Sequence, residues 1–316
     1  GLRTGRWLQN AGAVGTYLPG VLLIGLGTYA FFTRAPATPM PLEALVPDLS
    51  SRTRLNLWAS IAFAFAGLEL CAVLGGEVKD PRRNLPRSIL ISAPFIAFLY
   101  IAGTVTVLWL VPAGQVNIVS GFLQALAVGA RDIGIGAGWL AAFAAGLYVV
   151  GNIGGVGAWL TGPARVAFVI GLDRYFPPAF GRVHPRWKTP YVAILTQAVL
   201  ATVFLFLSVL GKGTTVEKAY LVILDTMLLV YFIPYLYLYA CFLVARMRDA
   251  PGGSVLSGRP AALLIGVCGF LFTLFAMIIA SIPPDSHEAG VFLAKVLGGA
   301  GACVAAGGVI YWLGRR

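Results

Sequence analysis

The sequence predicts an all-α polytopic membrane protein, and three observations lead to this fold class. First, 59% of the 316 residues are hydrophobic and 11% are charged, whereas a soluble domain carries about 25% charged residues. Second, the apolar residues form eight runs, each long enough to cross a hydrocarbon core about 30 Å thick as a helix. Third, lysine and arginine are concentrated in alternate loops, as the positive-inside rule requires.

The eight apolar segments have the length of membrane helices. A transmembrane β-strand needs only about ten residues of alternating polarity, and these runs are longer and continuously apolar. Their expected ranges are 7–32, 56–76, 89–111, 138–162, 191–210, 219–245, 261–282 and 289–313. The four cysteines lie within these runs without the spacing of metal ligands, so we expect free core cysteines and no metal site.

The distribution of basic residues predicts the orientation of the chain. Fifteen of the 23 lysines and arginines lie in one set of loops and end segments, including Lys79–Arg87, and six lie in the opposite set. The first set is expected to be cytoplasmic, with both ends of the chain inside. Val119–Ala130 is amphipathic and too short to span, so we expect a helix that lies at the surface or caps an external vestibule.

The stretch Phe63–Pro86 contains the strongest functional signal. Glu69 lies near the middle of the second apolar segment, where a lone ionisable side chain is costly and marks a functional site by default. Gly67 lets a helix open there, which is tolerated only where the opened backbone faces protein or a water-filled cavity. Two interpretations remain: a helix broken at a transport site, which we favour, or a close-packing glycine with a glutamate bonded to a neighbouring helix.

Two expected cytoplasmic loops, GGEVKDPRRNLPRS and GLDRYFPPAFGRVHPRWKTP, are basic and interrupted by prolines. Each follows an apolar segment that contains glycines. Their charges are expected either to anchor the loops at the membrane surface or to close an inner gate, in which Glu77 or Asp80 pairs with a loop arginine.

Several of these motifs resemble those of the amino acid–polyamine–organocation transporters. GLE followed by GGEVKDPRRNLPRSI resembles the sixth helix of that family and its following loop. GGVGAWLTGPAR with DRYFPPAFGRVHPRWKTP resembles the eighth helix and loop, and PYLYLY resembles the tenth. The resemblance covers nearly the whole chain and is greatest to the bacterial amino-acid antiporters. It implies transport of an amino acid or related amine by alternating access, in a bacterial cytoplasmic membrane.

On this pattern, the eight segments match family helices five to twelve. The resemblance therefore implies a partial LeuT-like fold, whose complete form has two inverted five-helix repeats. Within a single transmembrane domain, 1–316, residues 1–55 would hold the last helix of the first repeat and an external loop. Residues 56–245 would hold the second repeat, and residues 246–316 two extra helices. The first four family helices would be missing partners, so we expect that this chain cannot transport alone.

The resemblance also implies six residues that bind or gate the substrate in one cavity: Phe63, Ala66, Gly67, Glu69, Trp159 and Tyr235. Phe63 matches a ring that closes over the substrate, Trp159 a ring that faces it, and Tyr235 an inner gating tyrosine. Ala66 and Gly67 match the helix break, whose carbonyls would attract an ammonium and whose lower helix would attract a carboxylate. Glu69 matches an acidic position that couples the break to a neighbouring helix or carries a proton. Packing for Phe63 and a headgroup-facing position for Tyr235 are the alternatives.

The family's known coupling ions are not indicated by this sequence. Proton-coupled relatives use a lysine in the helix that matches Trp7–Phe32, and this stretch has none. Sodium-coupled relatives use hydroxyl groups next to the glycines that match Gly154 and Gly155, and the nearest hydroxyl downstream is that of Thr161. We therefore expect exchange of one amino acid for another compound, without a coupling ion or a cofactor.

Other classes of function fit the sequence less well. An enzyme is not expected, because the two histidines, His184 and His287, lie in loops and neither an HExxH nor a GxSxG motif occurs. No repeat typical of a channel filter is present. The net charge of +11 follows the positive-inside distribution, so nucleic acid is not an expected partner. A non-transporting membrane accessory or packing subunit remains the alternative function.

Overall fold

The computed structural model is all-helical over the part of the chain that it describes, which is residues 2–41, 43, 46, 51–73, 75–134, 137–209, 215–248, 258–283 and 289–314. Its helices are α1 (Leu2–Thr33), α2 (Arg52–Phe63), α3 (Leu70–Val73), α4 (Pro81–Leu110), α5 (Gly121–Asp132), α6 (Ala137–Leu172), α7 (Tyr191–Val209), α8 (Val216–Met247), α9 (Arg259–Ala280) and α10 (Ala289–Gly314). Short 3-10 turns occur at Gly75–Glu77, Ala113–Gln115 and Pro178–Gly181. These described ranges contain no strand, and the predicted all-α class is confirmed.

Among the described residues, six helices are long and apolar enough to cross a membrane: α1, α4, α6, α8, α9 and α10. Large apolar side chains on them, such as Ile91, Tyr237 and Leu264, are exposed, as expected for surfaces that face lipid. The chain is therefore an integral membrane protein. The sequence predicts eight spans, and the other two segments are helical but shorter. α7 has 19 residues, and segment 56–76 is interrupted between α2 and α3.

The basic segment after α3 is helical from Pro81 onward, which corrects the prediction of a loop that extends to Ser88. Proline suits the first position of a helix, because its φ is already helical and the N–H it lacks would have no helical partner there. Pro86 is accommodated one turn further on, inside α4. The three arginines of the PRRNLPR run are therefore exposed on the first two turns of a helix.

The helices group into two compact units. The first unit comprises Gly1–Val46 with Gly67–Ala198, and the second comprises Pro47–Ala66 with Val199–Arg316. The chain passes from the second unit to the first between Ala66 and Gly67. The boundary between the units therefore coincides with the helix break that the sequence predicts.

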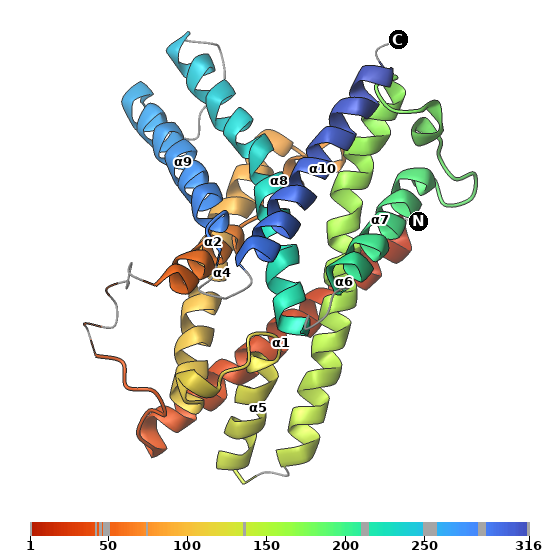
Figure 1. Cartoon of the computed structure of the whole chain (residues 1–316). Coiled ribbons are helices and arrows are strands. Elements are labelled where there is room, and N and C mark those ends of the chain that lie inside the picture. The colour runs from red at the N-terminus through yellow and green to blue at the C-terminus, as the bar shows by residue number, and fades with distance from the viewer. Residues whose placement is uncertain are drawn as a thin grey trace. The chain divides into compact units, whose positions relative to one another are not determined.

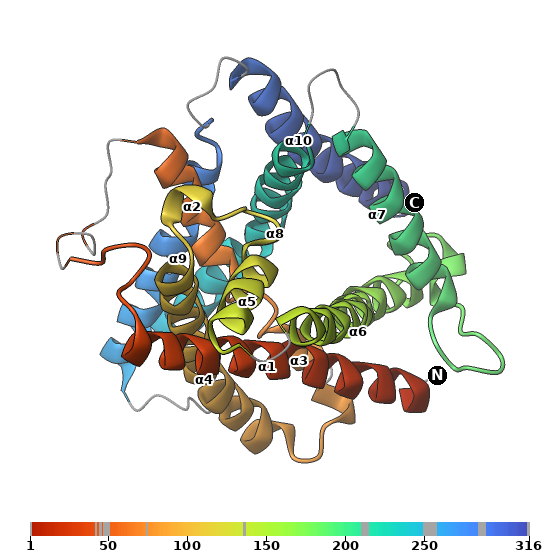
Figure 2. The same ribbon diagram turned by 90° about the horizontal axis from the view of Figure 1, so that it is seen from below.

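In the first unit, α1 packs along α6 through glycines that bring the two backbones into contact (Figure 2). A methyl group on Gly12 would overlap the backbone of Gly154, and one on Gly15 would overlap the backbone of Gly151. α4 and α5 also pack against α1, around a core of leucine, valine and alanine side chains. The amphipathic helix predicted at residues 119–130 is α5, and its apolar face is buried in this core.

In the second unit, α8 packs against α9 and α10, and α2 packs against α8 and α9 (Figure 1). The core of this unit is apolar and includes Leu228, Phe232 and Val296. Two polar side chains, Asn56 of α2 and Asp225 of α8, are nevertheless buried within it. Buried polar groups are costly without partners, so this pair is a candidate for function as well as for structure.

Candidate functional site

The predicted break is present as a turn that separates α2 from α3. α2 ends at Phe63, and the backbone then turns through Gly67, whose φ of +102° lies in the left-handed region that favours glycine. Oε2 of Glu69 accepts a hydrogen bond of 3.0 Å from the Gly67 N–H. The Gly67 carbonyl accepts from the N–H of Leu70, where α3 begins. Glu69 thus stabilises the turn in which it lies, a role that the sequence did not predict for it.

Trp159 of α6 lies over this turn. A methyl group on Gly67 would lie 3.2 Å from Cζ2 and 3.4 Å from Cη2 of the Trp159 ring, so the ring is in close contact with the glycine. Three residues further along α6, Gly162 makes room for the side chain of Leu70. The Trp159 side chain is still 41% exposed, so part of its surface is available to a ligand.

Phe63 and Tyr235 belong to one aromatic group in the second unit, contributed by α2 and α8. The Phe63 ring lies 5.5 Å from that of Tyr231 and 6.2 Å from that of Phe232. The Tyr235 ring lies 5.6 Å from each of the same two rings. These centroid distances are typical of aromatic packing. Phe63 therefore packs against α8, which is the alternative that the sequence left open for it.

The six predicted residues thus lie in two groups. The first unit holds the glycine, glutamate and tryptophan of the break, and the glycine contacts both of the other residues. The second unit holds the aromatic pair and Ala66, whose N–H donates to the carbonyl of Phe63. Their convergence on one cavity stays a prediction.

A buried polar pair in the second unit is absent from the residues predicted from the sequence. Asn56 is 1% exposed and Asp225 is 0% exposed. Nδ2 of Asn56 donates to Oδ2 of Asp225 at 2.9 Å and to the carbonyl of Ile282 at 3.3 Å. Oδ1 of Asp225 is buried and has no hydrogen-bond partner within the described part of the chain. The sequence contains a signal for this site, because Asp225, like Glu69, is a lone acidic residue inside an apolar segment.

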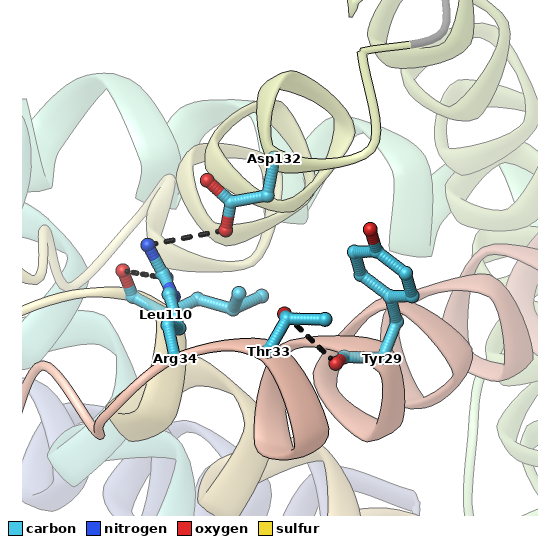
Figure 3. Close-up of polar contacts among 5 residues, drawn as sticks. All are labelled: Tyr29, Thr33, Arg34, Leu110 and Asp132. Atoms are coloured by element: carbon cyan, nitrogen blue, oxygen red, sulfur yellow. Dashed lines mark hydrogen bonds and ion pairs between the residues drawn. The ribbon is translucent and has the colours of Figure 1, made fainter.

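An ion pair joins the ends of three helices in the first unit (Figure 3). Arg34 follows α1, and its Nη1 lies 3.1 Å from Oδ2 of Asp132 at the end of α5. Its Nη2 donates to the carbonyl of Leu110, at the end of α4, at 2.9 Å. Both charged side chains are partly exposed, so the pair contributes little stability and mainly fixes the positions of the helix ends.

The predicted inner gate is not formed at Asp80. This residue is exposed, precedes α4 with a φ of +50°, and makes no ion pair with any described residue. The side chain of Glu77 lies outside the described residues. In the second basic loop, Nδ1 of His184 accepts from the N–H groups of Arg186 at 3.2 Å and Trp187 at 3.3 Å, and its ring stacks on Trp187. Local hydrogen bonds and stacking therefore organise this loop.

The group at the break has the chemistry of a site for a small amino compound. It combines the Glu69 carboxylate, a bent backbone and a partly exposed indole. A carboxylate attracts an ammonium group, and an indole face attracts a cation or an apolar side chain. Amino acids and simple amines carry an ammonium group, and many also carry an apolar side chain.

Comparison with known proteins places the chain among transporters. A family model described as amino acid permease matches residues 1–303. The chain is 29% identical over 280 residues to an uncharacterized transporter of Legionella pneumophila, and the match covers 86% of this chain and 58% of that protein. It is 25% identical over 293 residues to glutamate/gamma-aminobutyrate antiporters of two Lactococcus lactis strains, with 90% of this chain and 57% of each antiporter covered. The chain thus spans little more than half the length of these relatives. Because the family model covers nearly all of it, the chain belongs to the amino acid permease family, within the amino acid–polyamine–organocation superfamily.

Proposed function

We propose that the full-length protein transports an amino acid or a related amine across a membrane by alternating access, as an exchanger. The observation that carries this proposal is the interrupted segment between α2 and α3, in a member of the amino acid permease family. Glu69 holds the turn at Gly67, and Trp159 lies over it. A broken membrane helix is unfavourable unless it faces protein or a water-filled cavity, so its presence supports a transport site.

In this proposal, Glu69 and Trp159 contact the substrate. The Glu69 carboxylate accepts a hydrogen bond from the Gly67 N–H. Because an ionised carboxylate can accept several hydrogen bonds, it can also bind the ammonium group of a substrate. The exposed part of the Trp159 indole stacks on the substrate side chain. Gly67, with Ala66 before it, lets the turn change shape during the cycle.

Phe63 and Tyr235 are proposed to act as gating residues. Their rings are joined through Tyr231 and Phe232 at the contact of α2 with α8. α2 leads directly into the turn at the break, so a movement of α2 would separate Phe63 from this group. Separation of packed aromatic rings exposes apolar surface, which favours a return to the packed state.

We further propose that Lys79–Arg87 and the second basic loop face the cytoplasm, in a bacterial cytoplasmic membrane. The excess of lysine and arginine in this set of loops supports the orientation. The relatives named above come from bacteria, which supports the location. In this orientation the chain ends are cytoplasmic, and Arg34 and Asp132 lie on the outer side.

Helices of the same protein beyond this chain are proposed to complete the inverted repeats. The LeuT-like plan needs two five-helix repeats that move against each other around a central site. The relatives are longer than the region matched here, which is consistent with additional helices in the full-length protein. This chain is therefore not expected to transport by itself.

Counterflow in proteoliposomes tests the proposal. The full-length protein is reconstituted with an unlabelled amino-acid mixture inside, and uptake of single labelled amino acids is measured. Glutamate and γ-aminobutyrate belong in the panel because two relatives bear those names. We expect uptake of at least one compound that requires its counter-substrate inside. A folded protein that takes up none of the panel would favour the alternative, a non-transporting accessory subunit.

A further inference from the structure

The contact between α2 and α8 contains a second polar site, separate from the break. Asn56 and Asp225 are buried there among apolar side chains of the second unit. Asn56 uses its amide N–H groups on Oδ2 of Asp225 and on the carbonyl of Ile282, so it joins α2 to α8 and to the segment after α9. One turn further along α2, the Ser60 hydroxyl is also buried without a hydrogen-bond partner among the described residues.

The carboxyl group of Asp225 is incompletely partnered. Oδ2 has one neutral donor, and Oδ1 has none in the described part of the chain. The hydroxyl of the next residue, Thr226, does not help, because it donates to the carbonyl of Val222. An ionised carboxylate in an apolar interior with one neutral donor is strongly disfavoured, and addition of a proton removes this charge.

Among the described residues of the second unit, no basic side chain pairs with the carboxylate. The elements packed against α8 are α2, α9 and α10. Their described charged residues, with those of α8, are Arg54, Arg259, Lys295, Lys218 and Arg246. None of these forms an ion pair with Asp225. Because no described basic side chain pairs with Asp225, the group that neutralises its carboxylate is a bound proton.

We infer that Asp225 binds a proton in the α2–α8 contact and releases it when this contact opens, so that one proton moves with each transport cycle. The inference rests on the proposed transport function and adds a coupling ion to it. In the protonated state the O–H bond forms on Oδ1, because Oδ2 already accepts a hydrogen bond from the Asn56 amide. The proton comes from water on one side of the membrane and returns to water on the other side.

Burial links this proton to the movement of helices. Asp225 is fully buried, so proton exchange with water requires that α2 separates from α8. The same two helices carry Phe63 and Tyr235, and Asn56 lies two helical turns before Phe63. Loss of the proton would leave a charge that favours an open, hydrated contact, and its return would favour the closed one. The aromatic group would therefore open and close with the protonation of Asp225.

A metal cation fits this position less well than a proton does. Metal ions need several oxygen ligands and space between them. Asp225 and Asn56 are in direct hydrogen-bond contact, and both are almost completely buried. A proton needs neither a cavity nor additional ligands. Dependence on sodium is therefore an outcome that would contradict the inference.

The first test measures proton binding directly and does not depend on transport. Infrared difference spectra of the purified full-length protein are recorded between acid and alkaline pH, and the carbonyl band of a buried protonated carboxyl group is followed. We expect this band at acid pH, its loss at alkaline pH, and its absence from Asp225→Asn. The control, Asp173→Asn, removes an exposed carboxylate just after α6 and should keep the band. A band that is absent from the parent protein, insensitive to pH, or retained in Asp225→Asn would overturn the inference.

The second test reads coupling in proteoliposomes. The pH outside the proteoliposomes is made more acid than the pH inside, with the same counter-substrate concentrations in each measurement. If one proton moves inward with each substrate molecule, the inside-to-outside concentration ratio of the labelled substrate should rise about tenfold for each unit of pH difference. A sodium gradient at equal pH should have no effect. The shift should disappear in Asp225→Asn and persist in Asp173→Asn. An exchanger that ignores the pH gradient, responds to sodium instead, or keeps its response in Asp225→Asn would contradict the inference. Complete absence of counterflow would contradict the proposed function instead, and the infrared band would still decide whether Asp225 binds a proton.

Discussion

The indole ring of Trp159 lies so close to Gly67 that a methyl group at this glycine would be only 3.2 Å from the ring. Gly67 also has a φ of +102°, which side chains rarely tolerate. Two independent constraints therefore exclude a side chain at the break. The turn and the tryptophan behave as one structural feature, and a change in either should alter the other.

Replacement of Gly67 by alanine should destabilise the protein. The positive φ alone costs about 1–2 kcal/mol for a residue with a Cβ atom, and the contact with Trp159 adds to this. Gly146→Ala on α6 is the control, because no atom lies within 4 Å of the added methyl group. It should be neutral or stabilise the helix by up to about 1 kcal/mol. The melting temperatures of the two purified variants are compared by thermal unfolding. Equal melting temperatures would show that the turn does not exclude a side chain at Gly67.

Trp159→Leu should weaken substrate binding without unfolding the protein. The leucine keeps an apolar contact with the turn but loses a stacking surface. Loss of about 1 kcal/mol of stacking energy corresponds to a roughly fivefold weaker affinity. Trp139→Leu, at an exposed position near the start of α6, is the matched control. Substrate affinity should fall in Trp159→Leu and stay unchanged in Trp139→Leu. Normal transport by Trp159→Leu would show that this residue is not part of the proposed site.

Glu69 should tolerate glutamine better than leucine. Glutamine keeps an oxygen that can accept the Gly67 N–H, whereas leucine leaves this N–H without its partner. Loss of this partly buried hydrogen bond should cost about 1 kcal/mol, so Glu69→Leu should reduce abundance as well as activity. Glu69→Gln should fold normally but transport poorly, because it lacks the charge that attracts an ammonium group. Wild-type activity in both variants would limit Glu69 to local packing.

The contact between α1 and α6 should not tolerate a single methyl group at Gly154. A Cβ atom there would overlap the backbone of Gly12, and neither helix can move without disturbing its other contacts. We expect a loss of about 1–3 kcal/mol, typical of overpacking. The adjacent residue supplies the control, because a methyl group at Gly155 meets no atom within 4 Å. Thermal unfolding should distinguish Gly154→Ala from Gly155→Ala, and equal melting temperatures would contradict the close approach.

The proposed orientation can be checked with single cysteines in a background without the four natural ones. A membrane-impermeant maleimide should label Arg131→Cys, at the end of α5, in intact cells. Arg87→Cys, near the start of α4, should react only after the membrane is permeabilised. Both positions are exposed, so a difference between them reports the side of the membrane. Labelling of Arg87→Cys from outside would reverse the orientation.

The sequence by itself determined the helical class, the membrane environment and the position of the break. These features depend on local properties: the length of apolar runs, the cost of a charge among them, and the backbone freedom of glycine. The same local signals located Gly67 and Glu69 correctly within a turn. At Pro81 these signals are misleading, because a basic, proline-rich run predicts a loop although proline starts a helix well.

Only the tertiary structure decided which helix faces meet. Asn56 and Asp225 are 169 residues apart in the sequence, yet they share a hydrogen bond in the second unit. Phe63 packs against α8, Trp159 covers Gly67, and Gly12 contacts Gly154. Membrane helices are apolar on the sides that face lipid and on the sides that face protein, so hydrophobic periodicity cannot distinguish these sides. The partner of each face is set by close packing and by the need to satisfy buried polar groups, and both depend on the positions of helices that are distant along the chain.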